Sequence, residues 1–355
     1  MVLKCEKPRR ANPVVAAMPS RSILPSFARG RYPVLTMSLP LGLESLPKAE
    51  VHVHLTSTMR PATLEELSAR EGLNVPTSFN SLQGYLEVIR LAGETLRSPD
   101  DYWRLVREYC EDAARQGVRY AELELSTIKR PYDCLAAAID AASRQRDVEI
   151  RFIVSVRRSD PVDNAWAALE QATEAAQAGH VVAVGVSGQE AGFPPEPFAQ
   201  IFAEAKQRGL RSAPHAGEAA GPESVRGALE ALGAERIQHG VRVVEDPAVI
   251  RKLLERGVPL AVCLTSNLRL GIVPSLESHP IIQLWEAGVS VSVNTDMPGL
   301  LGCDLVGEYR IAGRLLRLDR NGFARLALNS VESSFAPDAL KAQLRTAISE
   351  WDSKG

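Results

Sequence analysis

The sequence predicts an α/β fold of the (β/α)8 TIM-type barrel class, with extra helices inserted after the first strand and at the C-terminus. From residue 46 onward, short runs rich in Val, Ile and Leu alternate with helix-like segments. Several of these runs are apolar without alternation, as strands covered on both faces of a parallel sheet are. There are eight such runs, each followed by a helical pattern, which is the order of a barrel.

The expected strands are short. In chain order they cover residues 51–55, 119–126, 149–156, 181–188, 210–215, 236–239, 259–266 and 289–296. The expected helices often end at a glycine, as helix C-termini do. They cover residues 62–71, 105–116, 134–144, 164–178, 197–208, 223–232, 247–256 and 281–287. Extra helices are expected near 82–91 and 100–114 in the first insertion, and near 305–316, 321–329 and 337–349 at the end.

The first 37 residues differ in composition from the rest. They carry seven Lys and Arg residues against a single acid, Glu6, and include several prolines. They contain no apolar stretch long enough for a secretory signal, and the prolines disfavour the amphipathic helix of a transit peptide. We therefore expect residues 1–37 to form a flexible extension, or to result from a start site upstream of Met37. Residues 38–355 are expected to form one domain.

The overall composition excludes several classes of protein. The formal net charge of −2 gives no basic field for nucleic acid or a membrane surface, so the expected partner is a small molecule. The sequence contains no apolar stretch of about 20 residues, so no transmembrane helix is expected. The five cysteines are widely spaced and form no CxxC pair, which favours a reducing cytoplasm over a disulfide framework.

Histidine and acidic side chains recur where the expected strands end. They are His52, His54, His215, Glu218, His239 and Asp296. Alternate residues of a strand share a face, so His52 and His54 can both face the barrel axis. The carboxyl ends of barrel strands meet at one mouth, where barrel enzymes build their sites. Three imidazoles and a carboxylate suit Zn²⁺, so the sequence predicts one zinc ion per chain.

The remaining groups suit proton transfer. Four protein ligands exceed the three usual for catalytic zinc, so we expect a five-coordinate ion with water as the fifth ligand. Such a water has its pKa lowered toward ~7. Glu218 follows a ligand by three residues and is placed to donate a proton, and His239 is expected to orient and deprotonate the water. A single strand-end histidine is more often structural, but four of the six histidines fall inside these motifs.

Several motifs together resemble the adenosine deaminase family of zinc-dependent amidohydrolases. The resemblance covers roughly residues 46–348. It rests on Leu46-Pro-Lys-Ala-Glu-Val-His-Val-His-Leu55, Ser187-Gly-Gln-Glu190, His215-Ala-Gly-Glu218, Arg236-Ile-Gln-His-Gly240, Cys263-Leu-Thr-Ser-Asn267, Asn294-Thr-Asp296 and Asn329-Ser-Val-Glu-Ser-Ser-Phe335. Their order, spacing and identity all match the family.

The resemblance implies a role for each matching residue. The zinc ligands would be His52, His54, His215 and Asp296. Glu218 would protonate the ring nitrogen beside the carbon under attack, and His239 would activate the water. Gly188 would place its backbone near another purine nitrogen, and His54 would also lie against the substrate. The implied reaction is hydrolytic deamination of adenosine or a closely related purine nucleoside, with release of ammonia.

The sequence departs from the family pattern at three positions. Met297 stands where the family has a second aspartate that contacts the purine, and a thioether is at best a weak acceptor. Thr56 stands where many members carry an acid that touches the sugar. Leu264 replaces a usual proline, which we interpret as a local backbone matter. We therefore keep as alternatives the same chemistry on an N6-substituted purine or another amino-heterocycle, redirected by Met297 and Thr56, and an inactive nucleoside-binding protein.

Overall fold

The structure is a computed structural model that describes residues 42–76, 82–126 and 132–354. The expected extension at 1–37 and the first residues of the expected domain, 38–41, lie outside the described residues. The boundary at residue 37 therefore stays a prediction.

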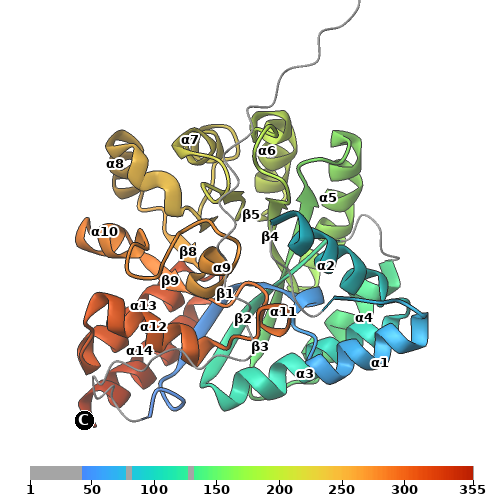
Figure 1. Cartoon of the computed structure of the whole chain (residues 1–355), viewed down its shortest axis with the longest axis horizontal. Helices are drawn as coiled ribbons and strands as arrows, with labels where there is room; N and C mark the ends of the chain where they lie inside the picture. The colour runs from blue at the N-terminus through green and yellow to red at the C-terminus, as the bar shows by residue number, and fades with distance from the viewer. Residues whose placement is uncertain (1–41, 77–81, 127–131, 355) are drawn as a thin grey trace, which may run out of the picture. The chain divides into compact units, whose positions relative to one another are not determined.

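The described strands form two all-parallel sheets. The first has the order β1 (Lys48–His54), β2 (Val118–Leu125), β3 (Glu149–Arg157), β4 (Val181–Ser187) and β5 (Arg211–Ser212). The second has the order β6 (His215–Ala216), β7 (Ile237–His239), β8 (Leu260–Val262) and β9 (Val291–Val293). Figure 1 shows the strands at the centre of the coloured part of the chain with helices around them. This arrangement confirms the predicted fold class.

Backbone contacts join the end of the second sheet, beyond β9, to β1 at the start of the first sheet. Beyond β9, Asp296 forms a parallel bridge with Val53 of β1. The N–H of His54 donates to the carbonyl of Asp296 at 2.8 Å, and the N–H of Asp296 donates to the carbonyl of His52 at 3.1 Å. The last strand is thereby joined to the first, and the backbones that carry three of the expected zinc ligands are fixed to one another.

The predicted strand at 210–215 is split into β5 and β6 at Pro214. The N–H of Ala213 still donates to Val184 of β4 at 3.0 Å, but proline has no N–H to continue that ladder. The carbonyl of Pro214 instead accepts from Gln238 of β7 at 2.9 Å. The chain thus changes partner at this point, and His215 begins the second sheet.

The helices lie between the strands and after the last of them. They are α1 (Pro61–Glu71), α2 (Leu82–Glu94), α3 (Pro99–Arg115), α4 (Tyr132–Ser143), α5 (Val162–Gln177), α6 (Ala199–Gln207), α7 (Pro222–Glu230), α8 (Pro247–Arg256), α9 (Leu264–Arg269), α10 (Ile281–Glu286), α11 (Pro298–Leu301), α12 (Leu305–Leu316), α13 (Arg320–Ser333) and α14 (Asp338–Ser353). Three short 3₁₀ helices are η1 (Leu55–Ser57), η2 (Glu196–Phe198) and η3 (Val241–Glu245). The expected extra helices after β1 and at the C-terminus are present.

The strand predicted at 259–266 is too long, because residues 264–269 form α9. The carboxylate of Glu308, on α12, accepts the N–H of Leu264 at 2.8 Å and that of Thr265 at 3.2 Å. These are first-turn donors of α9, which lack partners inside a helix. A residue more than 40 positions away therefore caps this helix, and no local pattern reveals that contact.

The core of the described chain lies between the strands and their covering helices. A smaller cluster lies inside the barrel, where Ile153, Ala183 and Ala213 pack together. No helix in the described ranges has the length and apolarity needed to cross a membrane. The four cysteines that lie within the described ranges are free.

Candidate metal centre and active site

All six side chains expected to carry the chemistry gather at the carboxyl ends of the strands. His52 and His54 come from the end of β1, His215 begins β6, and His239 ends β7. Glu218 follows β6 by two residues, and Asp296 follows β9 by three. The predicted grouping therefore appears in the structure, although residues from four strands had to meet to form it.

Four of these side chains surround one point. The Nε2 atom of His215 lies 3.2 Å from Nε2 of His52 and 3.3 Å from Nε2 of His54. Asp296 Oδ1 lies 3.3 Å from Nε2 of His54 and 3.6 Å from Nε2 of His52. The ligand atoms of the three histidines all lie within 4.8 Å of one another. Converging nitrogens and an oxygen at these spacings are the donor set of a divalent metal site.

The electrostatics of this group also fit a bound cation. Among the described residues Asp296 Oδ1 accepts no hydrogen bond, although it is buried. Burial lowers the pKa of His52 and of His215 well below the usual histidine value, so both rings are neutral and can offer a lone pair. Burial raises the pKa of Asp296 to about 6, against the effect of the nearby His54. A metal ion would supply the positive charge that this carboxylate lacks.

Neighbouring groups fix the orientation of two expected ligands. The carbonyl of Ala261 accepts from His52 Nδ1 at 3.1 Å, which leaves Nε2 of that neutral ring as the lone-pair donor. The Ser266 hydroxyl donates to Asp296 Oδ2 at 2.6 Å, which leaves Oδ1 for a metal. Such partners of metal ligands set both the tautomer and the aim of the side chain.

Glu124 is a functional candidate that the sequence analysis missed. It lies near the end of β2, and its Oε1 atom is 3.8 Å from Nδ1 of His54 and 3.8 Å from Nδ1 of His215. Burial raises the pKa of its carboxyl group to about 7, against the effect of the nearby Ser155 and Ser187 hydroxyls. Carboxylates beside the outer nitrogen of a metal-bound imidazole orient that ring. The only signal in the sequence was an acid at an inward position of a strand, which is weak by itself.

The turn that carries Glu218 is held by another carboxylate. Glu190 accepts the backbone N–H groups of Gly217 at 2.5 Å, Glu218 at 3.0 Å, Ala219 at 2.7 Å and Ala220 at 2.8 Å. Gly217 has φ +69°, and an added Cβ would lie 2.4 Å from Val225 Cγ2, so only glycine fits there. The sequence motifs around Glu190 and Glu218 therefore meet in one rigid turn.

The environment of Glu218 suits a proton donor. Burial raises its pKa well above the usual value, and the charges of Asp296 and Glu190 act in the same direction. Both effects favour the protonated form of this carboxyl group, which is the form that can donate a proton. Its Oε1 atom lies 3.5 Å from Nε2 of His239, and that nitrogen lies 4.0 Å from Asp296 Oδ2. The acid, the second histidine and the expected ligand Asp296 form one contiguous group.

Two of these residues have a backbone conformation that is unusual for their type. His239 and Asp296 each have φ +63°, in the left-handed region. Residues with a Cβ are disfavoured there, and such positions concentrate at functional sites. His239 is the last residue of β7 and Asp296 follows β9 by three residues, so the chain turns sharply at both points beyond the carboxyl ends of the strands.

Besides His54, three positions expected to contact substrate also lie beyond the carboxyl ends of strands. Thr56 is half-buried in η1, directly after β1, and Gly188 directly follows β4 with φ +87°. Met297 is buried beside Asp296 in a small apolar cluster with Tyr85 of α2 and Leu301 of α11. The Tyr85 hydroxyl donates to the sulfur of Met297. The first insertion therefore reaches the reaction site through α2.

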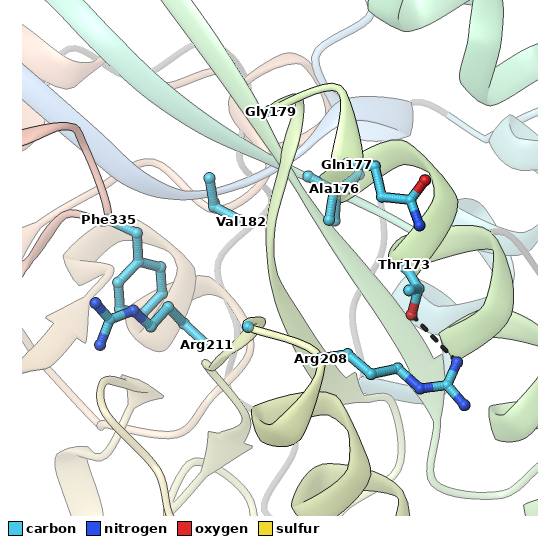
Figure 2. Close-up of a pocket in the computed structure, with 10 residues that line it drawn as sticks. Thr173, Ala176, Gln177, Gly179, Val182, Arg208, Arg211 and Phe335 are labelled. Carbon is cyan, nitrogen blue, oxygen red and sulfur yellow. Dashed lines mark hydrogen bonds between the residues drawn. The ribbon is translucent and has the colours of Figure 1, made fainter.

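A separate cavity of about 510 Å³ lies at the opposite ends of the strands. Its lining includes the first residues of β4 and β5 and parts of α5, and Figure 2 shows Arg208 and Arg211 at its edge. Both arginines are paired, Arg208 with Glu170 and Glu204 and Arg211 with Glu235. This cavity includes none of the six chemical residues, so it is not the reaction site.

Comparison with known proteins places the chain among deaminases. A profile of the adenosine deaminase family matches residues 47–351. The aminodeoxyfutalosine deaminase of Streptomyces avermitilis is 37% identical over 329 residues, which are 87% of this chain and 92% of that protein.

Solved structures agree with this placement. The adenine deaminase of Arthrobacter aurescens is 31% identical with a TM-score of 0.80, covering 87% of this chain and 99% of that one. An amidohydrolase from Burkholderia ambifaria that contains bound Zn is 28% identical with a TM-score of 0.81, covering 88% of this chain and 92% of that one.

Proposed function

The chain belongs to the adenosine deaminase family of hydrolytic aminohydrolases, and on this premise we propose that it deaminates adenosine or a closely related purine. In this reaction a water oxygen bonds to the amine-bearing ring carbon. The carbon–nitrogen bond then breaks, the ring keeps a carbonyl, and the nitrogen leaves as ammonia. The observation that carries the proposal is the group formed by Glu218, His239 and Asp296 beside three converging imidazoles.

The expected ligand set fits zinc. His52, His54, His215 and Asp296 would hold one ion, because their free donor atoms converge and Asp296 Oδ1 has no other described partner. When bound, zinc supplies a water whose pKa is lowered toward ~7. A relative of known structure contains bound Zn, which supports this choice of metal.

The chain's own residues would complete the reaction. Glu218, whose protonated form is favoured by burial, would pass a proton to the ring nitrogen beside the carbon under attack. That transfer makes the carbon electrophilic enough to accept water. His239 would orient the attacking water through Nε2, and the backbone of Gly188 would bind a second ring nitrogen. Proton transfer by a positioned acid contributes about 10²–10⁴-fold to such rates.

A substrate panel tests the proposed activity. The purified, zinc-analysed protein is incubated with adenosine, deoxyadenosine, adenine, AMP and N6-methyladenosine, and release of ammonia or methylamine is followed. Rapid turnover of a purine amine is expected. A metal-free protein that binds nucleosides without turnover would instead support the third alternative, an inactive binding protein.

A second candidate is the same chemistry on a different amine, and the surroundings of Met297 favour keeping it. The cluster of Met297, Tyr85 and Leu301 contains a thioether and a tyrosine hydroxyl but no charged group, where the resemblance implies a charged carboxylate. Relatives of this chain are named for adenine and for aminodeoxyfutalosine, so related chains act on different amines. Bound zinc without adenosine turnover would favour this candidate.

Replacing Met297 with aspartate tests which ring the site prefers. If Met297 has redirected the site, Met297→Asp should raise kcat/KM for adenosine and lower it for the true substrate. A hydrogen bond to a charged group contributes about 1.5–3 kcal/mol, so the ratio should change by about 10- to 100-fold. Met297→Leu, which keeps an apolar side chain, is the matched control and should leave the ratio near that of the wild type. If the ratio of the two kcat/KM values is unchanged in Met297→Asp, Met297 does not determine the substrate preference.

A further inference from the structure

Arg157 is a cationic side chain at the mouth of the barrel that has no role in the proposed reaction. It is the last residue of β3, and alternate residues of a strand share a face. Two residues earlier on that face, the Ser155 hydroxyl donates to the Ser187 hydroxyl at 3.0 Å, and two before that Ile153 lies in the cluster inside the barrel. Ile153, Ser155 and Arg157 therefore share the inward face of β3, and Arg157 lies at its carboxyl end.

Arg157 also lies beside a position expected to contact substrate. It pairs with Ser187 in the parallel register of β3 and β4, and Gly188 is the next residue along β4. A Cβ built on Gly188 would lie 3.9 Å from Cβ of Arg157. The side chain of Arg157 therefore starts within van der Waals reach of the backbone that is expected to bind the purine ring.

The guanidinium of Arg157 has no partner in the part of the chain that the structure describes. Its neighbours do: Arg158 donates to the carbonyls of Phe193 at 2.8 Å and His215 at 2.5 Å. On the same strand, Arg151 pairs with Glu149 at 2.6 Å. Arg157 is nevertheless half-buried. A guanidinium carries five N–H donors in a planar fork that matches the two oxygens of a carboxylate or a phosphate.

We propose that Arg157 binds an anionic oxygen group, a carboxylate or a phosphate, on the substrate of this enzyme. The proposal rests on the proposed deaminase function and narrows it, because it favours an anion-bearing purine amine over a neutral nucleoside. The amine end of the substrate would face Glu218 and His239, and the anion would lie against β3.

Matched substrates test the proposal. We compare kcat/KM for adenosine, AMP and adenosine 5′-carboxylate in the wild type and in Arg157→Met, which keeps length and removes charge. The kcat/KM of the variant should fall by about 10- to 100-fold for an anionic substrate and change little for adenosine. The phosphate and carboxylate arms show which anion is used. Arg151→Met, on the same strand, is the control and should lose on neither.

The possible failures are distinguishable. The role of Arg157 would be overturned if Arg157→Met changed kcat/KM equally for neutral and anionic substrates. It would also be overturned if the variant changed kcat/KM for neither anionic substrate. If the wild type hydrolyses none of the three, the proposed function fails, and Kd values for the same compounds still judge Arg157. In that case weaker binding of an anionic compound to Arg157→Met supports the role, and equal Kd values reject it.

A second, independent inference concerns the hydrogen bonds behind His239. The backbone N–H of Ile281 donates to His279 Nδ1 at 3.0 Å. His279 Nε2 lies 3.2 Å from Asn267 Oδ1, and Asn267 Nδ2 lies 3.3 Å from His239 Nδ1. All three side chains are buried. Asn267 belongs to a motif that the family resemblance includes without giving it a role.

The backbone N–H of Ile281 determines which atom donates and which accepts in each of these three hydrogen bonds. A backbone N–H can only donate, so His279 Nδ1 must offer a lone pair and that ring carries its proton on Nε2. Asn267 therefore turns its oxygen toward His279 and its NH₂ toward His239. His239 Nδ1 must then accept, which leaves the proton of that ring on Nε2.

We infer that His239 meets the reaction site as a hydrogen-bond donor, with Asn267 and His279 as the positioning residues that hold it so. In this tautomer Nε2 has no lone pair to remove a proton from water. It would donate instead to the attacking oxygen and hold a lone pair of that oxygen toward the substrate. The proton of the water would leave to solvent, because bound zinc would lower the pKa of that water toward ~7. The expected role of His239 in orienting water is kept, and its expected role as a base is replaced.

Nitrogen NMR of the holoenzyme labelled with ¹⁵N-histidine tests this directly, because the two neutral tautomers have distinct shifts. His239, assigned by loss of its signal in His239→Gln, should carry hydrogen on Nε2. Asn267→Asp presents two acceptor oxygens and should move that hydrogen to Nδ1, with lower kcat. His180, outside the chain of hydrogen bonds, should be unchanged in both proteins. Hydrogen on Nδ1 of His239 in the wild type would overturn the inference.

Discussion

Glu218→Gln is expected to lower kcat by about 10²–10⁴-fold, the usual contribution of a general acid, while zinc stays bound. Glutamine keeps the size of the side chain but holds no acidic proton to pass to the ring. The effect should be large because burial and the charges of Asp296 and Glu190 raise the pKa of the wild-type carboxyl and favour its proton-donating form. Zinc content and single-turnover rates measure the two properties separately.

A matched control separates this effect from a general loss of structure. Glu230→Gln removes an acid from the far end of α7, where Glu230 pairs with Lys252 at the surface, and should leave kcat near the wild-type value. Near-normal turnover by Glu218→Gln would show that another group supplies the proton. His239 Nε2, 3.5 Å away, would be the first to examine.

His54→Ala is expected to remove most of the bound zinc and, with it, most of the activity. The substitution takes away one of three converging imidazoles and leaves Asp296 Oδ1 with one close nitrogen fewer. A ligand present at about 1,000 times its Kd stabilises a fold by roughly 4 kcal/mol. Chelation should therefore lower the melting temperature of the wild type and leave that of His54→Ala nearly unchanged.

The control for this variant is His180→Ala, which removes a histidine before β4 that lies outside the cluster. Its zinc content, measured by elemental analysis after dialysis, should equal that of the wild type. Full zinc occupancy in His54→Ala would contradict the assignment of His54 as a ligand, whatever its activity.

The grouping of the candidate metal ligands could be predicted from sequence because each ligand stands in a short motif at the end of an expected strand. His52 and His54 share a face by alternation, and a barrel brings the carboxyl ends of its strands to one mouth. The fold class followed from the same regularity. Pattern and topology together were sufficient, and no contact between distant side chains had to be known.

Other features of the site depend on such contacts, and the sequence does not reveal them. Glu124 becomes notable only when His54 and His215 lie on either side of it. Residues 264–266 were predicted as the end of a strand because they directly follow the apolar run 260–263, but Glu308 caps them as the start of a helix. Tyr85, in the first insertion, meets Met297 only in the folded chain. Each of these contacts joins residues more than 30 positions apart.

The left-handed backbone at His239 and Asp296 has a consequence for how this protein can change over generations. Non-glycine residues in that conformation cost of order 1–3 kcal/mol each, and glycine escapes most of it. A change to glycine at either position should therefore destroy the chemistry while relaxing the chain. The reaction therefore holds these two residues in a backbone conformation that folding alone would not favour.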